Sequence, residues 1–192
     1  AKATIPISVI RPPIVVGDSQ TGEIDRFDGL YYMAMLVAIS PVSIPVPLPG
    51  EAIAPLNIIP VDYLLESAVR IARDKRAIGR TFHVVDPNPL SSRRVWEIVA
   101  ARVGRRLAPM SINSKLLSPL TRLPFLERFT RIPGQAMDYL NNLAIYNNDN
   151  TLEIMDGSGI FCPRFESYVD VLISYVKEHY KGGVSPNQYA SG

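Results

Sequence analysis

Residues 81–104, TFHVVDPNPLSSRRVWEIVAARVG, decide the fold class of this chain. The β-branched and aromatic side chains of residues 81–85 predict a strand. Prolines then turn the chain, and Ser91 or Ser92 caps a predicted helix that reaches about Val103. A strand, a proline-rich turn and a helix in this order are typical of α/β proteins. The stretch therefore predicts the α/β class.

Two apolar runs near the N-terminus extend this pattern. They are residues 5–10 and 14–16, with Pro12-Pro13 between them and Gly17 after the second. Apolar runs without alternation, bounded by turn residues, predict a strand that is buried on both faces. Such a strand needs a sheet around it, and little of the chain precedes it. We therefore expect the chain to be a piece of a larger α/β fold.

The remaining segments complete the predicted organisation. Helices are predicted at residues 27–39, capped by Asp28 and stopped by Pro41, at about 62–73, capped by Asp62, and at 135–145 and 165–180; short extended pieces are predicted at 58–61 and 151–155. Residues 41–60 and 114–133 are rich in proline, which interrupts helices. We predict that residues 1–180 form one substrate-binding portion and that residues 181–192 form a flexible tail.

Composition excludes several classes of protein. Apolar residues are 47% and charged residues 20%, which excludes a disordered chain. The 20 Lys and Arg exceed the 18 Asp and Glu by a net charge of only +2. Phosphate backbones need a concentrated basic face, so nucleic acid is not expected as a partner. One cysteine, Cys162, and two histidines provide neither an internal disulfide nor a zinc cluster.

One stretch is long enough to be tested against the membrane. Leu30 to Gly50 holds 21 residues without a charge. Four prolines crowd its second half, and each removes a helix hydrogen bond. We therefore expect a buried helix and a loop there, without stable membrane insertion. No signal peptide is recognised at the start of the sequence, so a cytoplasmic location is expected.

Recognisable catalytic motifs are missing from the sequence. It contains no G-x-G-x-x-G fingerprint, no G-x-S-x-G elbow and no Tyr-x-x-x-Lys pair. Residues 17–22 have the glycine spacing of a phosphate loop, but Glu23 stands at the lysine position and would repel phosphate. His83 and Cys162 are predicted to be structural. Two carboxylate pairs could serve as acid and base, although helix caps and solvated loops account for them better: Asp25 with Asp28, and Asp149 with Glu153.

Three segments resemble one known family. Residues 10–19, IRPPIVVGDS, resemble the R-P-x-x-V-x-G strand and loop of the extended short-chain dehydrogenase/reductases, the NAD-dependent epimerase/dehydratase superfamily. Residues 56–63, LNIIPVDY, resemble its h-I-P-V-D-h segment, and residues 79–87 its late sheet strand. Residues 11–28 are closest to the thioester and fatty acyl reductases, the male-sterility type. The resemblance covers about residues 5–103.

The resemblance implies a fold and a partner. The chain would be the C-terminal part of a Rossmann-like reductase, with late sheet strands and a mainly helical substrate-binding part. The family's glycine fingerprint and its catalytic Ser/Thr-Tyr-Lys set lie upstream of the R-P strand. The expected partner is therefore the N-terminal dinucleotide-binding half. No catalytic residue and no metal ligand is assigned in this chain.

The resemblance also implies where the ligands lie. The nicotinamide end of NADP or NAD would be lined by Pro12, Pro13, Ile14 and Val15. A loop at the mouth of the substrate cleft would contain Gly17, Asp18, Ser19 and Thr21. Both segments have plainer interpretations, a kink that ends a strand and a surface turn.

Three functions follow as hypotheses. The first is the substrate-side portion of an NAD(P)H-dependent oxidoreductase that reduces an acyl thioester or another apolar carbonyl compound. The second is a sugar-nucleotide epimerase or dehydratase of the same superfamily. A pyrophosphate substrate requires basic side chains, and Arg26 is the only base in residues 17–60, so this hypothesis ranks lower. The third is a non-catalytic module that binds lipid or another protein.

Overall fold

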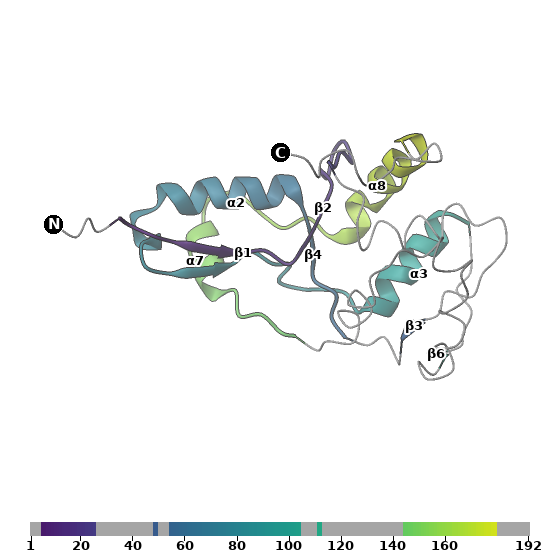
Figure 1. Ribbon diagram of the computed structural model, residues 1–192, viewed down its shortest axis with the longest axis horizontal. Coiled ribbons are helices and arrows are strands. Elements are labelled where there is room, and N and C mark those ends of the chain that lie inside the picture. The colour runs from purple at the N-terminus through teal and green to yellow at the C-terminus, as the bar shows by residue number, and fades with distance from the viewer. Residues whose placement is uncertain (1–4, 26–47, 50–53, 105–110, 113–143, 180–192) are drawn as a thin grey trace, which may run out of the picture.

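The computed structural model describes residues 5–25, 48–49, 54–104, 111–112 and 144–179 (Figure 1). The strands are β1 (Val9–Arg11), β2 (Ile14–Val16), β3 (Leu48–Pro49), β4 (Ile58–Pro60), β5 (Thr81–His83) and β6 (Ser111–Ile112). The helices are α2 (Val61–Arg73), the 3-10 turn η1 (Lys75–Ala77), α3 (Ser92–Arg102), α7 (Asp149–Met155) and α8 (Phe165–His179). Described strands pair in parallel, β1 with β5, β2 with β4 and β3 with β6. The predicted α/β class is confirmed.

The N-terminal extended segment changes its pairing partner at the two prolines. β1 pairs with β5 up to Arg11, which lies opposite His83. β2 then pairs with β4 from Ile14, which lies opposite Ile58. Proline has no N–H group and cannot donate to a strand ladder, so Pro12-Pro13 interrupts the first pairing before the second begins. One stretch of chain thereby joins two pairs of strands.

The β2–β4 pair lies between two hydrophobic cores (Figure 1). The α3–α8 core contains Val16, Leu56, Ile58, Val95, Ile98, Val99, Ala100, Phe165, Tyr168, Val169, Leu172, Ile173 and Val176. The α2–α7 core contains Ile59, Tyr63, Ile71, Ala77, Phe82, Val84, Ile154 and Met155, with Ile10, Val15, Leu64, Ile160 and Cys162 packed against it. Successive strand residues face opposite sides. β2 therefore packs against a core on each of its faces, as predicted, although only Val16 is fully buried and Ile14 and Val15 are half-buried.

The same prediction is wrong for the first apolar run. Ile5, Ile7 and Val9 are 74%, 64% and 42% exposed. These three residues alternate with Ser8, which is itself exposed although its Oγ donates to Ala77 O at 2.8 Å, and with Ile10, which packs against the α2–α7 core. Of residues 5–10, only Ile10 is packed against a core, and no described segment covers Ile5, Ile7 and Val9.

The two predicted capping residues have different outcomes. Ser91 caps α3, because its Oγ accepts a hydrogen bond from the backbone N–H of Arg94 at 3.2 Å. The prediction that Asp62 caps the helix at about residues 62–73, which is α2 in the structure, is wrong. α2 begins directly after β4 with Pro60 at the cap position and no side-chain cap bond, and Asp62 is the second residue of the helix.

Residues 151–155 form most of α7, so the predicted extended piece is wrong. Thr151, Ile154 and Met155 are the buried residues of α7, and this spacing of three and four is helical. The predicted helix at 27–39 lies wholly outside the described residues, and the one at 135–145 does so except for residues 144 and 145; residues 114–133 and 181–192 also lie outside them. No helix that the structure describes is long and apolar enough to cross a membrane. The cytoplasmic location stays a prediction.

Candidate functional site

The segments that follow the parallel strands form the candidate site. Pro12-Pro13 follow β1, residues 17–22 follow β2, and the first turn of α2 with Asp62 follows β4. Residues 84–86 follow β5. In open α/β sheets, ligands bind in the crevice outside the carboxyl ends of parallel strands. These segments are therefore where the fold itself places a binding site.

Asp18 organises the loop that follows β2. Its Oδ1 accepts hydrogen bonds from the backbone N–H groups of Gln20 at 2.8 Å and Thr21 at 2.9 Å. The backbone N–H of Gly22 donates to the carbonyl of Asp18 at 2.8 Å. The bonds from Thr21 and Gln20 lower the pKa of the Asp18 carboxyl below its usual value. Asp18 therefore acts as a structural anion that closes the turn.

The loop is attached to α2 through one carboxylate. Ser19 N donates to Asp62 Oδ1 at 2.9 Å, and Ser19 Oγ donates to Asp62 Oδ2 at 2.6 Å. Ser19 is 7% exposed, and a buried polar group of this kind requires partners. Asp62 lies in the first turn of α2, where the helix dipole stabilises a negative charge. The carboxylate therefore joins the carboxyl ends of β2 and β4.

On its other side, the loop packs directly on α8. Gly22 has φ of +75°, and a Cβ at this position would stand 2.7 Å from Tyr175 Cβ and 2.8 Å from the carbonyl oxygen of Val171. Such distances leave no space for a side chain. The loop is therefore held between α2 and α8.

The predicted ligand-binding residues differ in accessibility. Pro12 is exposed, while Pro13, Ile14 and Val15 are half-buried. In the loop, Thr21 is exposed and Asp18 is half-buried, but Gly17 and Ser19 are buried. Pro12 and Pro13 thus lie between β1 and β2, Ile14 and Val15 lie within β2, and the loop follows β2. Within the loop, the surface available to a ligand belongs to Thr21, Asp18 and the exposed Gln20.

Sequence reasoning missed a second connection, between Asn57 just before β4 and Asp86 beyond the end of β5. Asn57 Nδ2 donates to the carbonyl of Asp86 at 3.1 Å, and the backbone N–H of Asp86 donates to Asn57 Oδ1 at 2.9 Å. The amide side chain thereby connects the start of β4 to the chain that leaves β5. Burial raises the pKa of the Asp86 carboxyl, and the charge of Glu166 adds to this.

Tyr63 and Cys162 lie beside these carboxylates. Burial raises the pKa of the Cys162 thiol to about 12, and the charges of Asp86 and Asp62 add to this. Burial, followed by the charge of Cys162, raises the pKa of the Tyr63 hydroxyl to about 12. Both groups are therefore neutral near pH 7, and neither is suited to act as a base or a nucleophile there.

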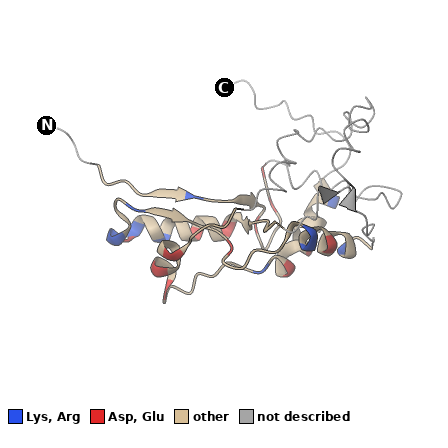
Figure 2. Cartoon of the chain, turned by 90° about the horizontal axis from the view of Figure 1, so that it is seen from below, with Lys and Arg blue, Asp and Glu red and all other residues tan. Residues whose placement is uncertain are grey.

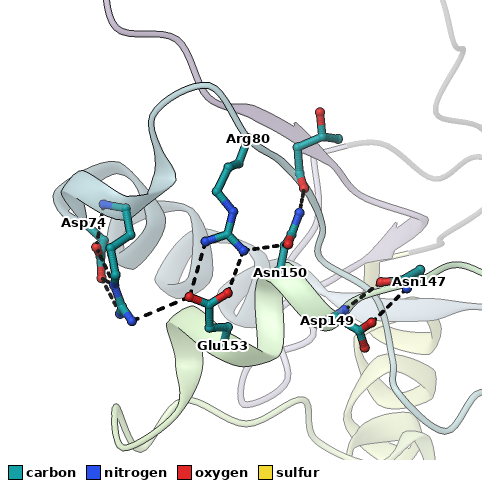
Figure 3. A network of polar contacts seen from close by, with 8 residues as sticks. Asp74, Arg80, Asn147, Asp149, Asn150 and Glu153 are labelled. Atoms are coloured by element: carbon teal, nitrogen blue, oxygen red, sulfur yellow. Dashed lines mark hydrogen bonds and ion pairs between the residues drawn. The ribbon is translucent and has the colours of Figure 1, made fainter.

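The carboxylates predicted as possible acid and base pairs do not act together in the structure (Figure 3). Glu153 Oε2 lies 2.6 Å from Arg80 Nη2, and this contact lowers the pKa of the Glu153 carboxyl. Asp149 instead accepts from Asn147 Nδ2 at 2.9 Å. Asp25 is exposed, and Asp28 lies outside the described residues. Glu153 and Arg80 fasten α7 to the chain that enters β5.

His83, which the sequence predicts to be structural, has two partners in the structure. His83 Nδ1 lies 2.9 Å from the carbonyl oxygen of Asn147, and the ring lies 5.7 Å from that of Tyr146. Among the described residues, no group of three or more His, Cys, Asp and Glu side chains could hold a metal ion.

Comparison with known proteins identifies sequences that are similar to this chain. Residues 1–68 match the model of an NAD-binding family that is described as the male sterility protein. The chain is 24% identical over 189 residues to a non-canonical nonribosomal peptide synthetase of Aspergillus hancockii, a match that covers 91% of the chain and 18% of the relative. It is 32% identical over 83 residues to an aldehyde reductase of Aspergillus flavus, and this match covers 43% of the chain and 8% of the relative.

Solved structures agree on the fold. The terminal R domain of the myxalamid PKS-NRPS pathway aligns with a TM-score of 0.69 at 22% identity, covering 91% of this chain and 44% of that one. The UDP-glucuronic acid 4-epimerase of Bacillus cereus aligns with a TM-score of 0.57 at 11% identity, covering 94% of this chain and 47% of that one. The chain therefore spans less than half the length of these relatives. In sequence and in fold, it resembles the extended short-chain dehydrogenase/reductases of the male-sterility type, as its motifs predicted.

Proposed function

We propose that this chain is the substrate-side, C-terminal portion of an NAD(P)H-dependent oxidoreductase that reduces an acyl thioester or another apolar carbonyl compound. One observation carries the proposal. The segment that matches the male-sterility family, residues 1–68, is the segment that supplies Pro12-Pro13, the loop of residues 17–22 and Asp62 at the ends of the strands. The relative named as an aldehyde reductase supports the same reaction class.

Pro12 to Val15 fit a role beside the nicotinamide ring of NADP or NAD. Pro12 is exposed and Pro13 half-buried at the end of β1, so this backbone is accessible to a ligand. The fixed φ of proline presents neighbouring backbone groups rigidly. A nicotinamide cofactor held here would supply the hydride, and Pro12 to Val15 would help to orient its ring.

The N-terminal dinucleotide-binding half is the proposed partner. Its helix N-terminus and glycines would hold the pyrophosphate, and the chain described here has no such motif. Ile5, Ile7 and Val9 offer the apolar face that a partner would cover, since parallel sheets are buried on both sides.

Charge favours an apolar carbonyl substrate over a sugar nucleotide. The described segments at the strand ends carry Asp18, Asp62 and Asp86, and Arg11 is the only base in residues 5–25 and 54–63. Figure 2 shows Lys and Arg mainly at the C-terminal end of α2 and on α3. An anionic pyrophosphate would be repelled at the strand ends. The fold shared with epimerases keeps sugar-nucleotide chemistry as the second candidate.

The test uses the chain joined to its dinucleotide-binding half. The assembled protein is incubated with NADPH or NADH and a long-chain acyl thioester, and cofactor oxidation is followed by absorbance. We expect turnover with the thioester and none with UDP-sugars, and negligible NADPH binding by the 192-residue chain alone in calorimetry. Turnover of UDP-sugars without thioester reduction would establish the epimerase alternative. If the assembled protein shows neither activity, the non-catalytic module is the remaining hypothesis.

A further inference from the structure

Asp62 makes contacts that its place in the helix does not require. A helix N-terminus needs acceptors for its free N–H groups, and a capping carboxylate supplies them from the position before the helix. Asp62 stands inside α2, and both of its carboxylate oxygens accept from Ser19, 43 residues away in the sequence. Its hydrogen bonds therefore serve the loop rather than the helix.

These two hydrogen bonds are of the strong kind. An ionised acceptor shortens and strengthens a hydrogen bond, and the Ser19 Oγ to Asp62 Oδ2 distance is 2.6 Å. Ser19 Oγ also accepts from Gln20 Nε2 at 3.2 Å, so the position of one exposed side chain of the loop depends on the same contact. The exposed residues Gln20 and Thr21 directly follow the anchored serine.

Several contacts make the loop a preformed element. Asp18 closes its turn, Asp62 holds Ser19 to α2, and Gly22 lies against α8. A loop with its backbone fixed on both sides loses little conformational entropy when a ligand binds to it. Its exposed edge is therefore suited to act as a rigid wall.

We propose that Asp62 is a positioning residue of the substrate site: through Ser19 it fixes the loop of residues 17–22, so that Gln20 and Thr21 form a preordered wall for the acyl substrate. This inference rests on the proposed reductase function. Asp62 is placed to contact the loop and acts on the substrate only through it. Its removal would weaken substrate binding while leaving hydride transfer unchanged.

The test compares variants of the assembled enzyme with NADPH and a long-chain acyl thioester. Asp62→Ala should raise KM for the thioester about tenfold or more, the equivalent of losing one hydrogen bond to a charged group, with kcat within about twofold of the wild type. Asp62→Asn keeps an acceptor for Ser19 N and should raise KM by only about threefold. Glu66→Ala, an exposed carboxylate one turn along α2, is the matched control and should change neither constant.

Two further measurements separate positioning from general destabilisation. Ser19→Ala should raise KM about threefold and add nothing in combination with Asp62→Ala, since both variants break the same contact. Hydrogen exchange on the chain should show the Ser19 amide exchanging at least tenfold faster in Asp62→Ala. Amides of β2 and of the middle of α2 should keep their wild-type rates.

The outcomes distinguish this inference from the proposed function. Normal thioester reduction by the wild type with an unchanged KM in Asp62→Ala would overturn the role of Asp62 and leave the reductase proposal intact. A fall in kcat at constant KM in Asp62→Ala would also overturn the positioning role of Asp62 and leave the reductase proposal intact. A wild-type protein that reduces no thioester would overturn the proposed function, and the substrate role of the loop with it.

Discussion

Replacing Gly22 by alanine tests how tightly the loop is held against α8. Gly22 has φ of +75°, where an L-residue costs about 1–2 kcal/mol. The new Cβ would also stand 2.7 Å from Tyr175 Cβ and 2.8 Å from the carbonyl oxygen of Val171. Relieving such overpacking costs about 1–3 kcal/mol. We therefore expect Gly22→Ala to lower the free energy of unfolding by about 2–5 kcal/mol.

Gly79→Ala is the matched control, because Gly79 has φ of +77° and a Cβ at this position would have no neighbouring atom within 4 Å. Only the conformational cost of about 1–2 kcal/mol should remain. Urea unfolding of both variants, followed by circular dichroism, measures the difference. If the free energy of unfolding falls by about 2 kcal/mol per M urea, the urea concentration at half-unfolding should fall by about 1–2.5 M for Gly22→Ala and by about 0.5–1 M for Gly79→Ala. Equal shifts would refute the close contact between loop and helix.

Three further predictions concern the strand ends. Replacing Pro12 and Pro13 together by alanine in the assembled enzyme should loosen the backbone beside the nicotinamide and lower kcat roughly 100-fold, the cost of a misplacement of about 1 Å, with little change in thermal stability. Asn57→Ala should lower the free energy of unfolding by about 1–3 kcal/mol, because both backbone groups of Asp86 lose their partner. Burial and nearby carboxylates raise the thiol pKa of Cys162 to about 12, so alkylation at pH 8.5 should be roughly a thousandfold slower than in the urea-unfolded chain.

Controls and contrary outcomes are available for each. Pro87→Ala, at an exposed proline, should leave kcat unchanged, and an unchanged kcat in the double variant would make Pro12-Pro13 a plain strand terminator. Asn88→Ala should leave the free energy of unfolding within about 0.5 kcal/mol of the wild type. The raised pKa of Cys162 favours the neutral thiol in the folded state, so its contribution is present below pH ~8.5 and is lost as pH rises towards 12. Rapid alkylation of the folded chain would contradict that shift.

The sequence predicted those elements whose signals are local. Ser91 caps α3 as expected, because a cap depends on a residue and the turn that follows it. For residues 151–155 the sequence pattern predicted a strand, because the apolar residues at 152 and 154 alternate. In the structure these residues are helical, and Thr151, Ile154 and Met155 are buried at helical spacing. A five-residue window fits both periods. Asn147, whose Oδ1 accepts from Asp149 N at 3.0 Å just before α7, was the available signal for a helix start.

Contacts between distant segments could not be predicted from local patterns. Asp62 precedes an apolar helical pattern, so the local sequence predicted a helix cap. Its hydrogen-bond partner in the structure, Ser19, is 43 residues away. Asn57 carried no signal for its contact with Asp86, because any exposed loop can contain an asparagine. Pro12-Pro13 predicted a kink, but the change of partner from β5 to β4 depends on residues far along the chain.

The thin β2–β4 pair has a consequence for how the described part of the chain unfolds. Neighbouring residues of the pair belong to different cores, Val15 and Ile59 to one and Val16 and Ile58 to the other. Neither core can open without exposing a side chain of this shared layer to water. Because both cores share this strand pair, we expect them to unfold as one cooperative unit rather than as two independent ones.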